Sequence, residues 1–235
     1  MVSTSIILPT YNESGNIENL LTAIEDNLLS LVEPAEIIVV DDQSPDGTAE
    51  IVRHHKCVSG VTVHLIVRET ERGLASAIRC GIDESKGNKI LVMDTDFNHD
   101  PIIIPRMILL LQYYDLVIGS RFVQGGGMED RARNAFSQVF NMFIRLILWH
   151  KIQDNLSGFF AIRREALFSL GHDSIFKGYG EFFIRLTYQA RHKNFSILEI
   201  PVFYKLRKEG QSKSNFVRML IDYTAAVLSL RFSGK

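Results

Sequence analysis

The feature that most constrains the fold is a short apolar run over residues 90–93 that ends in two aspartates, Asp94 and Asp96. A run of this length predicts a strand buried on both faces, as at the centre of a parallel sheet. The aspartates would then lie at the strand's carboxyl end, where open α/β sheets bind ligands. In an extended chain both side chains point the same way, so their oxygens could hold Mg²⁺ or Mn²⁺. A solvated turn is the alternative.

Apolar runs of strand length alternate with segments of helical periodicity along the chain. Strands are predicted over residues 4–8, 37–40, 61–67, 90–93, 116–120, 158–162 and 196–203. Helices are predicted over residues 15–32, 48–56, 73–84, 107–113, 135–149, 164–170, 179–192 and 216–230. This alternation predicts an α/β fold, a doubly wound and mostly parallel sheet flanked by helices. We expect one catalytic domain over residues 1–215, followed by a C-terminal amphipathic helix within 216–235.

The composition is that of an ordinary globular protein of 235 residues, with 46% apolar and 23% charged residues. The formal net charge of -1 gives no reason to expect a nucleic-acid partner. Cys57 and Cys80 fit neither a disulfide framework nor a metal spacing. With no leader-like segment and no apolar stretch of about 20 residues, these features predict a cytoplasmic protein.

Three predicted strands end in polar clusters, at residues 9–13, at Asp41-Asp42 and at Asp94–Asp96. A doubly wound sheet brings such strand ends together at one crevice. Acids at a nucleotide site repel phosphate, so a cation is needed there. Asp41 or Asp42 could accept a hydrogen bond from a ribose hydroxyl or a base edge. Arg121, after the next strand, could pair with a phosphate or diphosphate, or form only a surface ion pair.

Several motifs occur in a fixed order. They are Leu-Pro-Thr-Tyr-Asn-Glu at 8–13, Val-Asp-Asp-Gln-Ser-Pro-Asp-Gly-Thr at 40–48, Arg-Gly-Leu at 72–74, Met-Asp-Thr-Asp at 93–96 with His-Asp-Pro at 99–101, Gly-Ser-Arg-Phe at 119–122, Asp154 with Ser-Gly-Phe at 157–159, and Arg207 with Gly-Gln-Ser-Lys at 210–213. The ordered set resembles inverting family 2 glycosyltransferases with the GT-A fold. Within that family it most resembles the polyprenyl-phosphate glycosyltransferases, which include dolichol-phosphate mannose synthases.

The resemblance implies a role for each matching residue. The nucleotide sugar would be bound by Pro9, Tyr11, Glu13, Asp41, Asp94, Asp96 and Arg121. The metal, Mg²⁺ or Mn²⁺, would be held by Asp94 and Asp96. The acceptor phosphate would be bound by Arg131, Arg133, Ser157, Arg207 and Lys213. Catalytic roles would fall to Asp96, Arg121 and Asp154.

The implied reaction is inverting transfer of mannose from GDP-mannose to dolichyl or polyprenyl phosphate. A lipid phosphate is already ionised and needs no general base, whereas a sugar hydroxyl would require a carboxylate base. Asp154 is the candidate base in that second case, and otherwise orients the acceptor end or a basic residue. A UDP-sugar donor, or a glycan hydroxyl as acceptor, is the alternative within the same fold.

Two further alternatives belong to other classes of protein. A haloacid-dehalogenase-like phosphohydrolase also holds Mg²⁺ with a strand-end Asp-x-Asp, but its acids usually belong to an early strand. A scaffold subunit with an inactive transferase fold would have lost its metal acids or basic residues. Asp94, Asp96, Arg121 and Lys213 are all present, which favours an enzyme.

Many of the resembling enzymes continue into transmembrane helices, whereas this chain ends after one amphipathic helix. We therefore expect it to lie peripherally at the cytoplasmic face of a membrane, with a small membrane-anchoring subunit as a candidate partner. The helices over residues 135–149 and 216–230 would dock on the lipid surface with their basic neighbours. For residues 135–149, a helix buried between sheet and solvent is the alternative.

Overall fold

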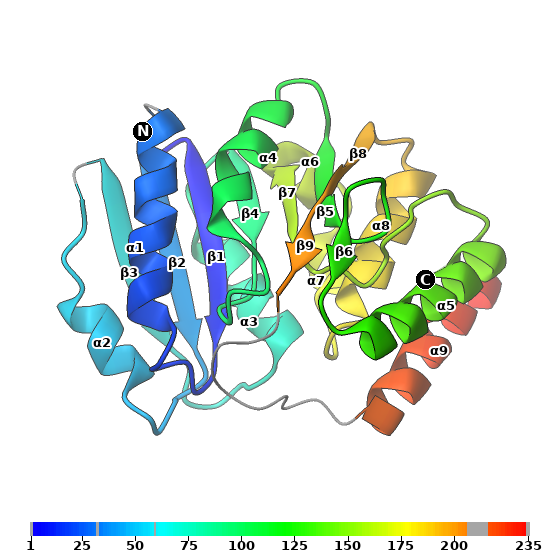
Figure 1. The fold of residues 1–235 in the computed structure, drawn as a ribbon, viewed down its shortest axis with the longest axis horizontal. Coiled ribbons are helices and arrows are strands. Elements are labelled where there is room, and N and C mark those ends of the chain that lie inside the picture. Colours follow the sequence, from blue (N-terminus) through cyan, green and yellow to red (C-terminus); the bar gives the residue numbers. More distant parts are fainter. Residues whose placement is uncertain (1, 32, 59, 206–215, 234–235) are drawn as a thin grey trace.

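The computed structural model describes residues 2–31, 33–58, 60–205 and 216–233. A seven-stranded sheet runs through the molecule in the order β3-β2-β1-β4-β7-β5-β8 (Figure 1). Its strands are β1 (Thr4–Thr10), β2 (Ala35–Asp41), β3 (Val61–Val67), β4 (Lys89–Val92), β5 (Leu116–Ser120), β7 (Phe160–Arg163) and β8 (Ile197–Pro201). All neighbouring pairs are parallel except those of β7, which is antiparallel to β4 and β5. The predicted mostly parallel sheet is confirmed.

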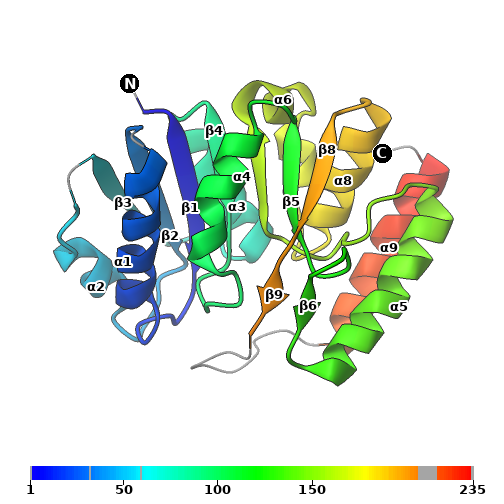
Figure 2. The ribbon, with the colours of Figure 1, turned by 45° about the horizontal axis from the view of Figure 1, so that its top comes forward.

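Helices cover both faces of the sheet (Figure 2). They are α1 (Ile17–Leu28), α2 (Thr48–His54), α3 (Leu74–Glu84), α4 (Ile104–Leu110), α5 (Arg131–Leu148), α6 (Arg164–Ser169), α7 (His172–Ile175), α8 (Phe182–His192) and α9 (Phe216–Ser233), with short 3-10 turns at Leu29–Leu31 and Pro101–Ile103. Strand β1 explains why the apolar runs are continuous. Its Ile6 and Leu8 belong to the core that includes α1, while Ile7 between them belongs to the core that includes α3.

The strand expected over residues 196–203 is two strands. β8 ends at Pro201, and β9 (Phe203–Tyr204) pairs in parallel with β6 (Gly127–Met128) in a separate two-stranded sheet. The division follows from the neighbouring strand, because β5 ends at Ser120 and its last carbonyl accepts from the Val202 amide. The segment after β8 thus leaves β5 and pairs with β6, which places Tyr204 of β9 beyond the carboxyl ends of β5 and β8.

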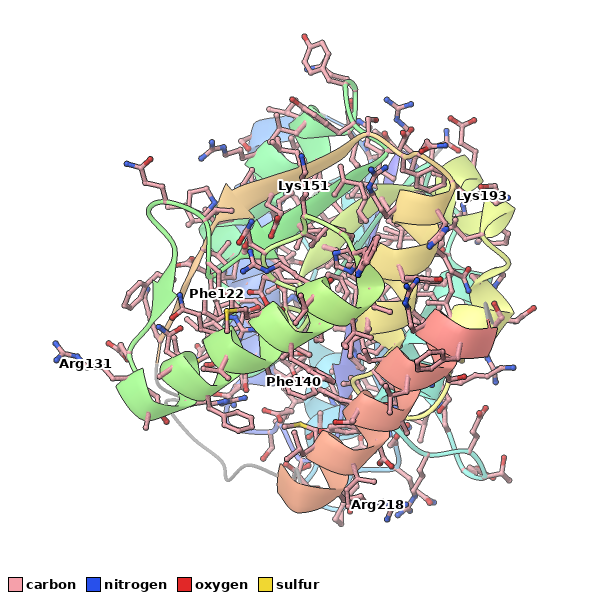
Figure 3. All side chains as sticks on the ribbon, turned by 90° about the vertical axis from the view of Figure 1, so that its right-hand side faces the viewer. Phe122, Arg131, Phe140, Lys151, Lys193 and Arg218 are labelled. Atoms are coloured by element: carbon pink, nitrogen blue, oxygen red, sulfur yellow. The ribbon has the colours of Figure 1, made fainter. Side chains whose placement is uncertain are left out.

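Helices α5 and α9 lie side by side and form a third apolar cluster with α8 (Figure 3). Phe140 and Ile144 of α5 are buried in it together with Val227 of α9. Helix α5 begins at Arg131, earlier than expected, because an Asp130 side-chain oxygen accepts from the Arg133 amide as an N-cap. Among the described residues, no helix is long and apolar enough to span a membrane.

Candidate active site

A cavity of about 380 Å³ lies at the carboxyl ends of β1 and β4, a size typical of small-molecule sites. Its wall contains Pro9, Thr10, Tyr11, Glu13, Asp42, Arg72, Gly73, Leu74, Ala77, Asp94, Thr95, Asp96 and Tyr179. We call it the donor-side cavity, after the nucleotide-sugar donor that the sequence resemblance implies. The structure thus brings together five of the residues expected to bind a nucleotide sugar: Pro9, Tyr11, Glu13, Asp94 and Asp96. The sequence offers no reason to place Tyr179 in this wall, because it lies far along the chain, between α7 and α8.

The two acids at the carboxyl end of β2 differ in position. Asp41 is fully buried and accepts from the Thr10 hydroxyl at 2.9 Å and the Ser44 amide at 2.8 Å, so it holds the turn beneath the cavity. Asp42 lies in the cavity wall, where it accepts from Arg68 and from the Gly73 amide at 2.8 Å. Of the two acids considered for a ribose or base contact, the structure therefore places Asp42 in the wall.

Asp94 and Asp96 both line the cavity, although the extended strand already ends at Val92. Asp96 accepts from the Asn98 amide at 3.1 Å and from the Asn98 side chain at 2.7 Å, in a turn where Phe97 has a left-handed φ of 60°. Two carboxylates from one turn face the same cavity, which is the oxygen donor set that Mg²⁺ and Mn²⁺ prefer. The residues present therefore fit a hard divalent cation.

The imidazole of His99 lies directly behind Asp94. Its Nδ1 accepts from the Asp94 amide at 2.8 Å, and its ring is stacked on Phe159 with centroids 4.6 Å apart. The ring is fully buried, and this burial lowers the pKa of His99 to about 4. The sequence motif included His99, but reasoning from residues gave it no role.

A second cavity of about 550 Å³ opens between α5 and α9. Its wall is formed by Arg121, Asp130, Ala132, Arg133, Phe136, Ser137, Phe140, Leu156, Met219, Leu220 and Tyr223. We call it the acceptor-side cavity. Of the two arginines that begin α5, Arg133 is in this wall, and Arg131 is exposed outside it. The two cavities are neighbours, because the backbone of Gly180 lies against the Tyr223 hydroxyl and directly follows Tyr179.

Arg121 and Asp154 form a buried ion pair at the base of the acceptor-side cavity. Arg121 donates through Nε at 2.8 Å and through Nη2 at 2.7 Å, and its backbone amide also binds Asp154. Asp154 is fully buried, and the Arg121 guanidinium lies over the Tyr204 ring at 4.8 Å. Both oxygens of Asp154 are thus bound to Arg121, an arrangement that positions the guanidinium.

The remaining expected acceptor residues are placed differently. Ser157 is buried and is hydrogen-bonded to the Gly119 carbonyl and the Tyr204 hydroxyl, behind the cavity wall and not in it. Arg207 and Lys213 lie outside the described residues. The part of the site beyond Lys205 therefore stays a prediction from the motif.

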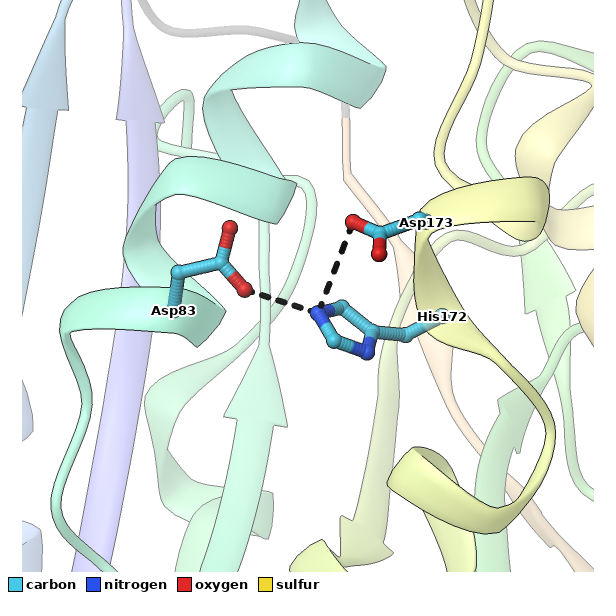
Figure 4. A group of neighbouring side chains, drawn as sticks. All are labelled: Asp83, His172 and Asp173. Carbon is cyan, nitrogen blue, oxygen red and sulfur yellow. Dashed lines mark hydrogen bonds and ion pairs between the residues drawn. The ribbon is translucent and has the colours of Figure 1, made fainter.

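A different group of metal-type ligands lies at the far end of α3 (Figure 4). His172 Nε2 is 2.7 Å from Asp83 and 3.9 Å from Asp173. Asp83 follows Leu74 of the donor-side cavity by nine residues, roughly 13 Å along the helix axis. The group is therefore separate from the cavity, and the 2.7 Å contact already gives the imidazole a hydrogen-bond partner.

Comparison with known proteins assigns the family. The family model described as glycosyl transferase family 2 matches residues 5–171. The chain belongs to this family of glycosyltransferases. It is 37% identical to a dolichol-phosphate mannosyltransferase of Pyrococcus furiosus, over 90% of this chain and 59% of that relative's length. It is 34% identical to an undecaprenyl-phosphate mannosyltransferase of Micrococcus luteus, over 97% of this chain and 95% of the relative.

The fold is likewise shared with solved glycosyltransferases. Glucosyl-3-phosphoglycerate synthase of Mycobacterium tuberculosis, solved with Mn²⁺, UDP and glucosyl-3-phosphoglycerate, matches with a TM-score of 0.68. The match covers 98% of this chain and 80% of that one, at 20% identity. This likeness confirms the predicted GT-A fold.

Proposed function

We propose that the protein transfers mannose from GDP-mannose to a polyprenyl or dolichyl phosphate, with inversion at the sugar and with Mg²⁺ or Mn²⁺ as cofactor. The observation that carries the proposal is the pairing of two neighbouring cavities of opposite character. One is lined by Asp94 and Asp96, and the other combines Arg133 with an apolar wall. The names of the relatives, which refer to dolichol-phosphate and undecaprenyl-phosphate mannosyl transfer, support the same substrate classes.

The donor-side cavity would bind the nucleotide sugar. Asp94 and Asp96 would hold the cation, which supplies positive charge for the diphosphate that leaves. Asp42, held by Arg68 and the Gly73 amide, offers carboxylate oxygens in the same wall for the ribose or base. Tyr11 and Tyr179 add aromatic surface to the cavity.

The acceptor-side cavity would bind the lipid phosphate. An oxygen of the ionised phosphate attacks the anomeric carbon, the bond from that carbon to the nucleotide diphosphate breaks, and a single displacement inverts the configuration. No proton has to be removed, so no general base is required. Arg133 and Arg121 would neutralise the acceptor phosphate, and Phe136, Phe140 and Leu220 would contact the first isoprene units.

Asp154 is accordingly assigned a positioning role towards Arg121. Both of its oxygens bind that guanidinium, and burial leaves it no exposed surface. The base role considered from the sequence applies only if the acceptor is a sugar hydroxyl.

Helices α5 and α9 would place this cavity at a membrane surface. They expose apolar side chains: Val139, Met142 and Leu146 on α5, Trp149 directly after it, and Ile221, Leu228 and Phe232 on α9. Basic residues such as Arg131, Lys151 and Arg218 lie around the same face (Figure 3). Apolar and basic side chains on paired helices suit peripheral binding to anionic lipid at the cytoplasmic face, alone or with a membrane-anchoring subunit.

The test is transfer to a lipid acceptor from a panel of donors. The protein is incubated with Mn²⁺ or Mg²⁺, labelled GDP- or UDP-sugars, and either polyprenyl phosphate or a free glycan as acceptor, beside Asp96→Ala. We expect β-linked mannosyl lipid from GDP-mannose and none from the variant. No transfer from any donor, with the two proteins indistinguishable, contradicts the proposal. Transfer from a UDP-sugar changes the donor, and transfer only to a free glycan assigns Asp154 as the base.

A further inference from the structure

His99 carries one buried nitrogen that the fold leaves without a well-formed hydrogen bond. The ring has no exposed surface, and among the described residues its Nε2 makes no hydrogen bond of ordinary geometry, although the Ser157 backbone lies near enough to raise the pKa of the ring slightly against the larger effect of burial. A buried donor or acceptor without a well-formed hydrogen bond is costly, because it has lost its water and gained no full replacement. Such a nitrogen beside a binding site calls for an explanation by what the site binds.

The other ring nitrogen fixes the tautomer. Nδ1 lies 2.8 Å from the Asp94 backbone nitrogen, which can only donate, so Nδ1 is the acceptor and carries no proton. The neutral ring therefore has its proton on Nε2. That Nε2–H lies 3.8 Å from Oδ2 of Asp94, just beyond hydrogen-bond distance. The imidazole thus contacts both the backbone and the carboxylate side of the same residue.

The ring is held in this orientation from two sides. Phe159 is stacked on it with an interplanar angle of 9°, and Tyr204 is tilted against it with centroids 4.9 Å apart. Tyr204 in turn is hydrogen-bonded to Ser157 and lies beneath the Arg121 guanidinium. The ring is therefore fixed by its neighbours, and the acceptors on the side of its Nε2–H are the Ser157 backbone and the Asp94 carboxylate.

We propose that His99 is a positioning residue, whose Nε2–H donates to the Asp94 carboxylate and orients it towards the bound cation. This inference rests on the proposed cation site at Asp94 and Asp96. The gap of 3.8 Å closes to hydrogen-bond distance with a shift of about 1 Å in the carboxylate. Partners of this kind commonly orient metal ligands, and their loss typically weakens metal binding by about 10- to 100-fold.

Two substitutions separate the nitrogens of the ring. His99→Asn keeps an acceptor near the Nδ1 position and removes the Nε2 donor. His99→Gln keeps a donor near the Nε2 position and loses the Nδ1 acceptor. Both remove the stacking on Phe159 and Tyr204, so packing loss is matched between them. Mn²⁺ affinity is measured by electron paramagnetic resonance with GDP present, for both variants, the wild type and Asp96→Ala.

We expect His99→Asn to weaken Mn²⁺ binding about 10- to 100-fold, with His99→Gln within about threefold of the wild type. An equal loss of Mn²⁺ affinity in both variants overturns the donor role, because it indicates that the packing of the ring is what matters. A larger loss in His99→Gln also overturns it, because it indicates that the hydrogen bond from the Asp94 amide to Nδ1 is what matters. If the wild type binds Mn²⁺ no better than Asp96→Ala, the cation site itself fails, and the role of His99 fails with it.

A measurement on the unaltered protein guards against variants that do not fold. In nitrogen-15 spectra of the wild type, His99 should show a protonated Nε2. Addition of Mg²⁺ and GDP should shift the Nε2–H resonance in the direction of a stronger hydrogen bond. A resonance that does not move while Mg²⁺ binds contradicts the proposal.

Discussion

Arg121 and Asp154 are joined by two parallel hydrogen bonds of 2.8 and 2.7 Å, between side chains that are 33 residues apart in the sequence and buried together. The pair connects the end of β5 to the segment after α5. Its burial means that each charge depends on the other, because an isolated charge at this depth has no solvent to stabilise it.

The first prediction concerns this pair. Asp154→Asn should lower the free energy of unfolding by about 3–5 kcal/mol, because it leaves a buried guanidinium uncompensated. Arg121→Met with Asp154→Leu should cost less than the two single changes added together, because no charge is left alone. Urea unfolding of the wild type, Asp154→Asn, Arg121→Met, Asp154→Leu and the double variant measures these differences. Additive losses would show that the two side chains are not coupled.

The second prediction concerns the acids of the donor-side cavity. Asp96→Asn should abolish Mn²⁺-dependent binding of GDP, because it replaces an ionised ligand with a neutral one. Asp26→Asn is the matched control, since Asp26 is an exposed acid on α1 that does not line the cavity. Titration calorimetry with and without Mn²⁺ gives the comparison. Retained binding in Asp96→Asn would remove the metal site from this position.

How much of this site was predictable depends on how local its signals are. The β4 strand was predicted correctly, and so was the position of Asp94 and Asp96 after its carboxyl end, because the apolar run and the two acids are adjacent in the chain. Which of Asp41 and Asp42 lies in the cavity wall could not be predicted, because it depends on the turn at Gln43, whose φ of 55° is left-handed. Alternation of side chains between two faces describes only an extended chain, and β4 ends at Val92, so it does not by itself orient Asp94 and Asp96.

Non-local pairings were beyond the sequence. The strand at β7 was predicted, but not its place between β4 and β5 or its antiparallel direction, since nothing in a four-residue strand specifies its neighbours. The sequence offered Arg121 a phosphate or an ion pair, and it offered Asp154 a basic residue to orient, but it did not show that these two residues pair with each other. His99 was missed because a histidine in a polar turn is ordinary until its burial is known.

The third prediction separates the two arginines at the start of α5. Arg133→Gln should raise the KM for polyprenyl phosphate about tenfold, corresponding to one charge-assisted hydrogen bond of about 1.4 kcal/mol. Arg131→Gln should change it by less than about threefold, because Arg131 lies outside the wall of the acceptor-side cavity. Initial rates at saturating donor give both values. Equal effects would indicate only a general attraction for the anionic acceptor.

The fourth prediction concerns pH and His150, which is buried with neither ring nitrogen hydrogen-bonded among the described residues. Burial, followed by the charges of Arg191, Arg145 and His192, lowers the pKa of His150 to about 4. A lowered folded pKa means that the unfolded chain takes up the proton first as pH falls below about 6.5. Stability is therefore lost between about pH 6.5 and 4.

His150→Phe should remove this contribution, so that the drop in unfolding free energy from pH 7 to pH 5 becomes smaller by about 2 kcal/mol. His54→Phe, at an exposed position on α2, should leave the drop unchanged. Thermal and urea unfolding at both pH values provide the test. The same acid sensitivity in His150→Phe and the wild type would contradict a buried neutral imidazole at this position.

The fifth prediction concerns the outward face of α5 and α9. Trp149 is the single tryptophan of the chain and is 80% exposed, with Arg231 of α9 lying 5.2 Å over its ring. Its fluorescence should shift to shorter wavelength with vesicles that contain anionic lipid, because the indole enters the interface. Leu146→Ser should weaken vesicle binding about three- to tenfold, since it removes apolar surface from the same face. Leu109→Ser, equally apolar and exposed on α4, should have no effect, and binding lost equally in both would place the contact elsewhere.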